Sequence, residues 1–311
     1  MYDLTIIGGG PAGVAAGVYA SRKQLKTLFV TETFGGQSVV SDGIENWIGD
    51  IKVSGLDLAK KFEAHLGAYA EDFVDIKKGY RAENLSKNSE EAFDIEIKKG
   101  EDVEKFQTKS VLVTSGSNRR KLEIKGANEF EHRGVTYCAS CDGPIFKDKD
   151  VVVVGGGNSA FESAAQLLAY CKSVTLIHRR DQFRADPVTI KALKKDPKFK
   201  IITNSEITEI LGEVMVTGVK YKNKESKEEN FMEISGIFVE IGAIPAISFI
   251  GDLVELSEQG SIKIDPWNQR TSVEGIWAAG DCTNVLYNQN NIAAGDAVKA
   301  LEDIYVWLKS R

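Results

Sequence analysis

A glycine-rich turn between an apolar run and an alanine-rich stretch is the feature that most constrains this chain. Residues 2–7 form the apolar run, Gly8-Gly9-Gly10-Pro11-Ala12-Gly13 the turn, and residues 14–22 the stretch behind it. A second apolar run, Leu28-Phe29-Val30, follows. Short apolar runs predict buried strands and the alanine-rich stretch predicts a helix, so we expect a β-α-β unit.

The same order of segments returns in the second half of the chain. Four valines at 151–154 precede Gly155-Gly156-Gly157-Asn158-Ser159-Ala160, a helical stretch reaches Tyr170, and Val174-Thr175-Leu176-Ile177 comes next. A glycine turn between a strand and a helix is typical of folds that bind dinucleotides. The sequence therefore predicts two copies of a nucleotide-binding unit.

Alternating polar and apolar residues follow each unit. Residues 80–113 predict a small antiparallel sheet, and residues 201–221 with 231–241 predict a second one. Residues 276–279 read as a strand and 293–308 as an amphipathic helix, but this last part of the chain has no complete nucleotide fold of its own. It must therefore complete the first domain.

The expected fold class is α/β, with two Rossmann-like nucleotide-binding domains, the second inserted in the first. The predicted boundaries are 1–115 for the first part of the first domain, 116–244 for the inserted domain and 245–311 for the second part. Hinges are expected near residues 115–120 and 242–246.

Length and charge narrow the function classes. At 311 residues the chain is long enough for two domains. Its 39 basic and 45 acidic residues give a net charge of −6, which disfavours nucleic acid and anionic lipid as partners. No apolar run has the length of a membrane span, and the N-terminus passes directly into the first strand, so we expect a soluble cytoplasmic protein with no membrane partner.

The first glycine turn has the spacing Gly8-x-Gly10-x-x-Gly13, and Glu32 stands at the end of the next predicted strand. Such glycines let backbone N–H groups approach a pyrophosphate, and an acid at this place binds a ribose hydroxyl. The alternative is a glycine-rich turn without a ligand. Nucleotide binding is favoured because strand, helix and acid all stand where that function needs them.

The second turn, Gly155-x-Gly157-x-x-Ala160, is followed by basic residues instead of an acid. His178-Arg179-Arg180 and Arg184 stand after its second predicted strand. A carboxylate there would select NAD, whereas a basic cluster accommodates the extra phosphate of NADP. The interpretation favours NADPH over the alternative of a solvated basic turn.

Four cysteines occur, two of them as Cys138-Ala139-Ser140-Cys141. A close pair can exchange electrons with a disulfide, since one thiolate attacks and the second resolves the mixed disulfide. Zinc is not expected, because there is no second Cys-x-x-Cys and only three histidines occur. Asp142 is the candidate acid/base, although Asp-Gly-Pro is also a plain turn sequence. Cys171, on a predicted helix, and Cys282 are expected to be buried and inert.

Along essentially its whole length the sequence resembles bacterial-type, low-molecular-weight thioredoxin reductase. The resemblance is carried by the order of separate motifs: Gly8–Gly13, Gly35-Gly36-Gln37, Glu45-Asn46-Trp47, Cys138–Gly143, Gly155–Ala160, His178-Arg179-Arg180 and Gly275–Asp281.

The resemblance implies FAD on the first and last segments and NADPH on the inserted domain, in a homodimer that reduces thioredoxin or a thioredoxin-like protein. Cys141 would accept electrons from the flavin, Cys138 would attack the substrate disulfide, and the inserted domain would rotate to bring nicotinamide and dithiol to the flavin in turn. The expected FAD residues are Gly8, Gly10, Pro11, Ala12, Gly13, Glu32, Gly36, Gln37, Asn46, Asp281, Gln289 and Asn290. The expected NADPH residues are Gly155, Gly157, Asn158, Ser159, His178, Arg179, Arg180 and Arg184.

Two segments depart from the family pattern. Tyr287-Asn288-Gln289-Asn290-Asn291 replaces a Tyr-Arg-Gln-Ala-like stretch, and Gly242-Ala243-Ile244-Pro245 lacks a basic or aromatic residue after its glycine. These departures leave the electron donor open. The alternatives are a dithiol oxidase of the same fold that passes electrons to oxygen, a flavin redox sensor, and a reductase that does not depend on NADPH. A peroxiredoxin-linked flavoprotein is expected less, because its additional N-terminal dithiol domain is not in this sequence.

Overall fold

The computed structural model describes residues 1–310 apart from 42, 71, 90 and 138, and for residues 40, 140 and 141 it describes the backbone alone. The chain forms two compact units. The first contains Met1–Asn118 and Ile244–Arg311, and the second, Arg119–Ala243, is inserted in it. The inserted arrangement and the α/β fold class are as the sequence predicts.

The first unit is built on a mixed sheet. Its strands run in the order β3-β2-β1-β6-β5-β4, with β17 beside β6. The strands β1, β2, β3, β6 and β17 are parallel, whereas β4 and β5 are antiparallel to their neighbours. Their bounds are β1 Tyr2–Gly9, β2 Thr27–Phe34, β3 Val74–Lys78, β4 Arg81–Lys87, β5 Phe93–Lys99, β6 Asp102–Val113 and β17 Ile276–Ala278.

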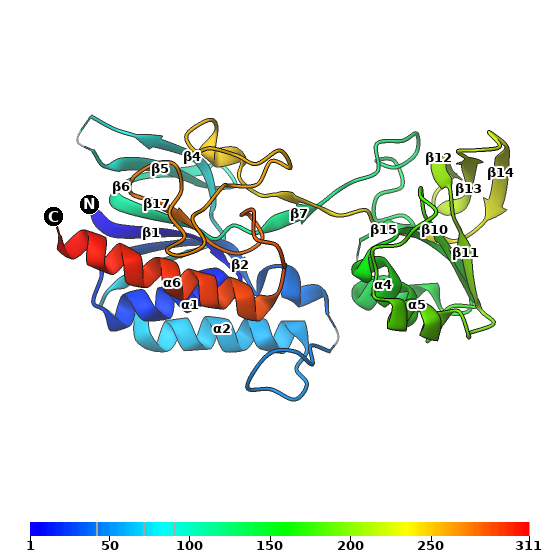
Figure 1. Cartoon of the computed structure of the whole chain (residues 1–311), viewed down its shortest axis with the longest axis horizontal. Coiled ribbons are helices and arrows are strands. Elements are labelled where there is room, and N and C mark those ends of the chain that lie inside the picture. The colour runs from blue at the N-terminus through cyan, green and yellow to red at the C-terminus, as the bar shows by residue number, and fades with distance from the viewer. Residues whose placement is uncertain (42, 71, 90, 138, 311) are drawn as a thin grey trace. The chain divides into compact units, whose positions relative to one another are not determined.

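Three helices of the first unit lie side by side on one face of this sheet, below it in Figure 1. They are α1 (Pro11–Arg22), α2 (Gly55–Ala70) and α6 (Asn290–Lys309). Small buried residues let α1 and α6 pack closely: Ala16 and Ala20 on α1, and Ala297 and Ala300 on α6, are all fully buried. This packing ties the last segment of the chain to the first and fixes both beside the glycine turn.

The inserted unit has a parallel sheet in the order β11-β10-β9-β15-β8 and a separate antiparallel sheet β12-β13-β14. Val151–Val154 of β9 are all buried, as expected of a strand covered on both faces. The bounds are β8 Val135–Thr136, α3 Ala139–Asp142, β9 Asp150–Gly155, α4 Asn158–Leu168, β10 Ser173–Ile177, α5 Pro187–Leu193, β11 Phe199–Ile202, β12 Ser205–Gly212, β13 Val216–Asn223, β14 Glu229–Glu233 and β15 Gly236–Glu240.

The chain passes between the units in two short strands that pair with each other, β7 (Ser117–Arg119) and β16 (Ala243–Pro245). The unit boundaries fall between 118 and 119 and between 243 and 244. Three 3₁₀ turns complete the described elements: η1 (Gly36–Val40), η2 (Gly143–Phe146) and η3 (Ser248–Ile250).

The antiparallel pairing predicted for residues 80–113 is present, but β4 and β5 extend the mixed sheet of the first unit instead of forming a sheet of their own. The second predicted antiparallel sheet is present as β12-β13-β14 and is narrower than predicted. The strands β11 and β15 join the parallel sheet instead. Residues 237–239 are buried without alternation, which is the pattern of a parallel strand rather than of a meander. Among the described residues, no helix combines the length and apolar character that crossing a membrane requires.

Candidate functional site

A cavity of about 550 Å³ opens in the first unit at the carboxyl end of β1. The chain leaves β1 on one side toward β2, and β6 lies on its other side, so this is the point where the strand order reverses. Ligands of open α/β sheets bind at such a switch point. The cavity is lined by the glycine turn, the end of β2, the start of β4, residues 114–118 and residues 279–281.

The glycine turn forms a cradle that side chains would fill. Gly8 has φ +120°, and a Cβ added to it would lie 2.3 Å from the carbonyl oxygen of Thr114. A Cβ on Gly13 would lie 1.8 Å from the carbonyl oxygen of Gly8, so α1 approaches the strand as closely as its backbone allows. Helix α1 begins at Pro11 against this cradle, and a helix N-terminus stabilises an anion. The cradle therefore fits a pyrophosphate.

Hydrogen bonds hold the walls of the cavity in place. Thr114 Oγ1 donates to the carbonyl oxygens of Ile7, at 2.9 Å, and Gly8, at 3.3 Å. Gln37 Nε2 donates to the carbonyl oxygen of Ser117 at 2.9 Å, so the segment after β2 is tied to the segment after β6. The cavity is thus shaped by hydrogen bonds from side chains to backbone carbonyls of distant parts of the first unit.

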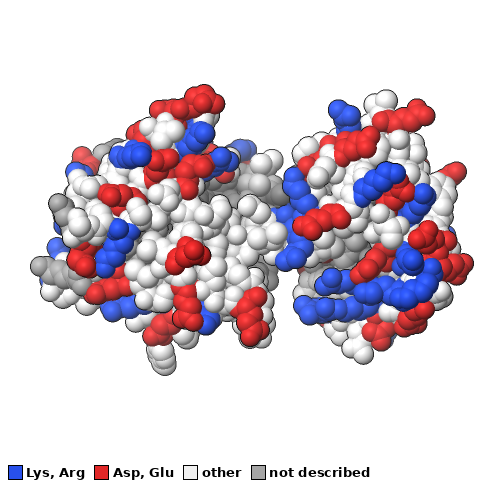
Figure 2. All heavy atoms as spheres, turned by 90° about the horizontal axis from the view of Figure 1, so that it is seen from above, with Lys and Arg blue, Asp and Glu red and all other residues white. Residues whose placement is uncertain are grey.

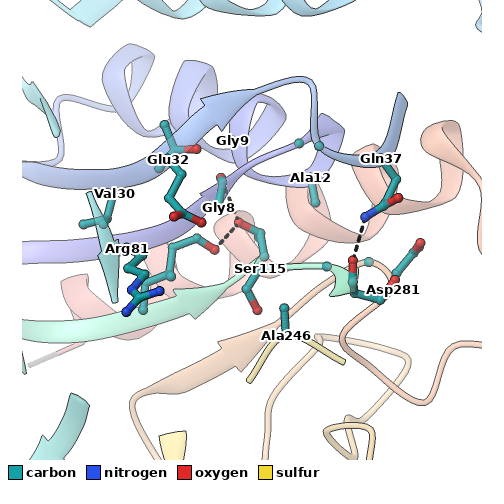
Figure 3. A pocket seen from close by; sticks show the side chains of 18 of the residues that line it. Gly8, Gly9, Ala12, Val30, Glu32, Gln37, Arg81, Ser115, Ala246 and Asp281 are labelled. Atoms are coloured by element: carbon teal, nitrogen blue, oxygen red, sulfur yellow. Dashed lines mark hydrogen bonds between the residues drawn. The ribbon is translucent and has the colours of Figure 1, made fainter. Parts of the chain in front are cut away.

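The two ends of the cavity differ in chemistry. Figure 3 shows Glu32 and Arg81 at one end and Gln37 and Asp281 at the other, with the glycine turn between them. Arg81 is ion-paired with Glu83 of the same strand. An acid beside the end of β2 is where a ribose hydroxyl is bound in dinucleotide folds. This layout matches a dinucleotide lying along the cavity with its pyrophosphate at the turn.

Most of the residues predicted to bind FAD line this cavity. They are Gly8, Gly10, Pro11, Ala12, Glu32, Gly36, Gln37, Asp281 and Asn290. Gly13 lies directly behind Gly8. Asn46 and Gln289 are not among the lining residues; they bond to each other, Asn46 Nδ2 donating to Gln289 Oε1 at 3.0 Å.

Sequence reasoning missed several parts of the cavity wall, among them Tyr80–Glu83 at the start of β4 and Thr114–Asn118 after β6. Neither of these two segments carries a motif. Their place follows from β6, which adds to β1 and brings its carboxyl end to the same edge of the sheet. The alternating pattern of residues 80–113 predicts a sheet, but it does not tell which edge of the first unit that sheet meets.

The inserted unit repeats the turn at the carboxyl end of β9, which lies between β10 and β15. Gly155 has φ +158°, and a Cβ added to it would lie 2.3 Å from the carbonyl oxygen of Glu240. Helix α4 begins at Asn158, and the Ser159 of its first turn is exposed. This is a second switch point with the geometry of an anion-binding helix N-terminus.

The basic segment after β10 closes against this second turn. Two hydrogen bonds join the segment to the turn: the Arg184 N–H donates to the carbonyl oxygen of Gly156 at 2.8 Å, and the Asp186 N–H donates to Asn158 Oδ1 at 2.8 Å. Within the segment, His178 Nε2 lies 3.1 Å from the carbonyl oxygen of Gln182. Burial, with the neighbouring arginines adding to it, lowers the pKa of His178, so its ring is neutral at pH 7. The charge of this segment comes from its arginines.

Arg179, Arg180 and Arg184 are exposed. Figure 2 shows a band of Lys and Arg side chains on one face of the inserted unit. The strand order and the backbone contacts bring one set of predicted residues to the same edge of the parallel sheet: Gly155, Gly157, Asn158, Ser159, His178, Arg179, Arg180 and Arg184.

The predicted redox pair is only partly described. Cys138 lies outside the described residues, and Cys141 lies in α3, where the structure gives its backbone. Asp142 follows directly, and Thr136 Oγ1 donates a hydrogen bond to Asp142 Oδ2. Thr136 precedes the cysteine pair in the sequence and Asp142 follows it, and this hydrogen bond holds the carboxylate of the candidate acid/base.

Cys171 and Cys282 are buried, as predicted. Burial raises the pKa of each thiol to about 11. The prediction that Cys171 stands on a helix is wrong: α4 ends at Leu168, and Cys171 follows in the turn before β10. Among the described residues, no group of three or more Cys, His, Asp or Glu side chains is arranged to hold a metal ion.

Two Rossmann-like units, one inserted in the other and each with a glycine turn at its switch point, define a two-domain dinucleotide-binding α/β protein. The sequence model of the pyridine nucleotide-disulphide oxidoreductases matches residues 2–297. The chain belongs to this family.

Solved structures agree closely with this fold. Thioredoxin reductase from Lactococcus lactis superposes with a TM-score of 0.92 at 34% identity, over 100% of both chains. Thioredoxin reductase from T. acidophilum superposes with a TM-score of 0.87 at 36% identity, over 98% of both chains. The resemblance to low-molecular-weight thioredoxin reductases is confirmed.

Curated relatives carry other names. An NADH dehydrogenase from Bacillus subtilis is 37% identical over 96% of this chain, and the F subunit of alkyl hydroperoxide reductase from Pseudomonas putida is 39% identical over 96%. The chain spans 57% and 56% of the length of these two relatives.

Proposed function

We propose that this protein is a flavoprotein disulfide reductase that passes electrons from NADPH through FAD and the Cys138/Cys141 pair to a thioredoxin-like protein. Residues 1–115 and 245–311 form the FAD domain in this proposal, and residues 116–244 form the NADPH domain with the redox pair. We expect a homodimer, as the resemblance implies. Cys171 and Cys282 are free and buried, so the Cys138/Cys141 pair is the one that we expect to react. Free thiols of this kind suit the reducing conditions of the cytoplasm.

The observation that carries the proposal is the cavity of the first unit. Its glycine cradle, its acid at the end of β2 and Asp281 after β17 line one continuous space of about 550 Å³. We assign this space to FAD, with the pyrophosphate at Gly8–Gly13 and a ribose at Glu32. Bound FAD would carry two electrons between the nicotinamide and the protein disulfide.

The basic segment of the inserted unit supports NADPH as the donor. Arg179 and Arg180 stand at the end of β10, where a dinucleotide fold meets the ribose 2′ position. Guanidinium groups bind phosphate with charge-assisted hydrogen bonds. The inserted unit holds both this site and the cysteine pair, so it must present each of them to the flavin in turn.

The dithiol performs the exchange with the substrate. Cys138, as the thiolate, attacks one sulfur of the acceptor disulfide, forms a mixed disulfide and releases the other sulfur as a thiolate, which takes a proton from Asp142. Cys141 gives its proton to Asp142, attacks the Cys138 sulfur as a thiolate and releases the second acceptor thiolate, which takes a proton from solvent. The Cys138–Cys141 disulfide is left, and a hydride equivalent from NADPH, delivered through bound FAD, would restore the dithiol together with one proton.

The relatives named for alkyl hydroperoxide reductase and for NADH dehydrogenase favour a second candidate. In it the same flavin and dithiol draw electrons from NADH and deliver them to a dithiol domain of a peroxide-reducing system or to oxygen. The two candidates share the chemistry of the cysteine pair and differ in donor and acceptor.

One experiment separates the candidates. Purified protein saturated with FAD is mixed with NADPH, NADH or reduced ferredoxin, and turnover is followed with a panel of thioredoxins, a peroxiredoxin-linked dithiol domain, small dithiols and oxygen. We expect NADPH oxidation that depends on a thioredoxin. Protein that binds no flavin refutes the proposal, and NADH oxidation with oxygen alone establishes the second candidate instead.

A further inference from the structure

Arg119 occupies an unusual place in the inserted unit. Its Nη1 donates one hydrogen bond to Glu240 Oε1 at 2.9 Å and another to the carbonyl oxygen of Tyr137. Tyr137 directly precedes Cys138 in the sequence. One guanidinium nitrogen thus holds the residue at which the dithiol segment begins.

Glu240 is a buried anchor for this contact. Its side chain is 7% exposed, and its Oε1 also accepts a hydrogen bond from Ser163 Oγ of α4 at 2.7 Å. Burial raises the pKa of Glu240, while the Arg119 guanidinium and the Ser163 hydroxyl oppose that rise. Buried carboxylates are retained where they are paired and hydrogen-bonded, as Glu240 is.

The Arg119 contact begins where main-chain pairing stops. The strands β8 and β15 pair through Val135 with Ile237 and Thr136 with Phe238. Beyond Thr136 the chain leaves the sheet toward the cysteines, and Arg119 joins Tyr137 to Glu240 at the end of β15. The guanidinium therefore continues the link between these two segments past the last backbone pair.

The anchor also contacts the nucleotide turn of the inserted unit. Glu240 pairs in register with Gly155, and Ser163 lies on the helix that starts at that turn. Arg119 itself stands on β7, the strand by which the chain enters the inserted unit. The Arg119–Glu240 ion pair therefore contacts three segments that the proposed function uses: the connecting strand, the dithiol segment and the nucleotide turn.

We propose that Arg119, anchored by Glu240, is a positioning residue for the dithiol segment and sets the geometry in which the Cys138/Cys141 pair reacts. The inference rests on the proposed function of that pair. A thiolate attacks a disulfide along the line of the S–S bond, so a small displacement of the attacking sulfur slows the exchange strongly. Release of the Tyr137 carbonyl lets the dithiol segment move, whereas the nucleotide turn keeps its own backbone contacts.

The test compares two variants that keep the fold. In Arg119→Met/Glu240→Met both charges are replaced by apolar groups of similar length, which leaves no unpaired buried charge. In the matched control Glu240→Gln, an amide oxygen still accepts from Arg119 and Ser163, so the Tyr137 carbonyl stays held. FAD content, unfolding temperature, flavin reduction by NADPH and disulfide reduction are measured for both.

We expect the double variant to keep its FAD and its KM for NADPH while kcat for disulfide reduction falls roughly 10- to 100-fold. Glu240→Gln should stay within about threefold of the native chain. Native kcat in the double variant overturns the inference, and so does a fall in Glu240→Gln as large as that in the double variant. Loss of FAD and thermal stability together with kcat also overturns it, because Arg119 would then be structural only.

A second readout separates this inference from the proposed function. The reduced proteins are treated with iodoacetamide without NADPH or acceptor, and the alkylation rate of the Cys138/Cys141 pair is measured by mass spectrometry. We expect a rise of at least about threefold in the double variant, because release of the Tyr137 carbonyl frees the segment that carries both thiols. An unchanged rate overturns the positioning role. Absence of any disulfide reduction by the native chain overturns the proposed function instead.

Discussion

Removal of the two arginines after β10 is the sharpest test of the donor assignment. Their segment is fixed by backbone contacts, the Arg184 N–H to Gly156 and the Asp186 N–H to Asn158, and these do not use the guanidinium groups. Arg179→Gln/Arg180→Gln should therefore leave the turn in place. Any loss of affinity then reports contacts to the ligand rather than a collapsed site.

The magnitude follows from the exposure of both side chains. A hydrogen bond to a charged group contributes ~1.5 to 3 kcal/mol, and exposed groups such as Arg179 and Arg180 lie at the low end. Two such contacts sum to about 3 kcal/mol, which corresponds to roughly a 100-fold change in binding. Each single variant should lose roughly tenfold.

Steady-state kinetics with NADPH and NADH provide the measurement. KM for NADPH should rise roughly 100-fold in the double variant, whereas KM for NADH should stay within about twofold, because NADH lacks the 2′-phosphate. Lys227→Gln removes one exposed charge from the turn between β13 and β14, so it is the net-charge control for each single variant. Equal changes with NADPH and NADH, or a rise below about threefold with NADPH, would refute this reasoning.

Three further predictions address the cavity, the cysteines and acid stability. Gly8→Ala should lose most of its FAD, because the new Cβ would lie 2.3 Å from the Thr114 carbonyl oxygen. The control Gly49→Ala, at a φ of +108° with nothing within 4 Å of the new Cβ, should keep its FAD. Equal flavin absorbance in both variants would contradict the assignment of the glycine turn to the pyrophosphate. Iodoacetamide at pH 8 should label the Cys138/Cys141 pair and spare Cys171 and Cys282. The raised pKa of about 11 leaves roughly one in a thousand of these two buried thiols ionised. Peptide mapping that finds Cys171 or Cys282 labelled in the folded protein would contradict this prediction. Lys125 and Lys220 lower the pKa of Glu209 to about 2, so the stability that the Glu209 carboxylate adds is present above its ordinary pKa and is lost as the pH falls toward 2. Unfolding curves should therefore show that acid reduces the stability of Glu209→Gln less than that of the native chain. An identical reduction in both would argue against these ion pairs.

Sequence patterns predicted the fold because each glycine turn indicates both its own conformation and the order of the strand and helix around it. A buried run, a turn that only glycine permits and an alanine-rich helix are each local signals, and their order admits one topology. The inserted arrangement follows because residues 245–311 supply a strand and a helix without a turn of their own. In the structure β17 adds to β6, and α6 packs on α1.

The walls of the cavity were harder to predict, because they depend on which strands become neighbours. Tyr80–Glu83 and Thr114–Asn118 reach the cavity only through the pairing of β6 with β1 and of β4 with β5. The same limit explains β15, which follows the preceding meander in the sequence but pairs with β9. Periodicity reports burial along one strand and does not specify its partner.

The ion pair between Arg119 and the buried Glu240 could not be predicted from sequence patterns. Arg119, Tyr137, Ser163 and Glu240 are far apart in the chain and belong to no shared motif. Alone, each reads as an ordinary polar residue near a strand or helix end, and only the parallel order β9-β15-β8 brings them together. A polar group buried at a sheet edge must find its partners from neighbouring strands, so its contacts follow from topology rather than from spacing. The dithiol motif therefore identifies the chemistry, and the strand order identifies the residues that hold it in position.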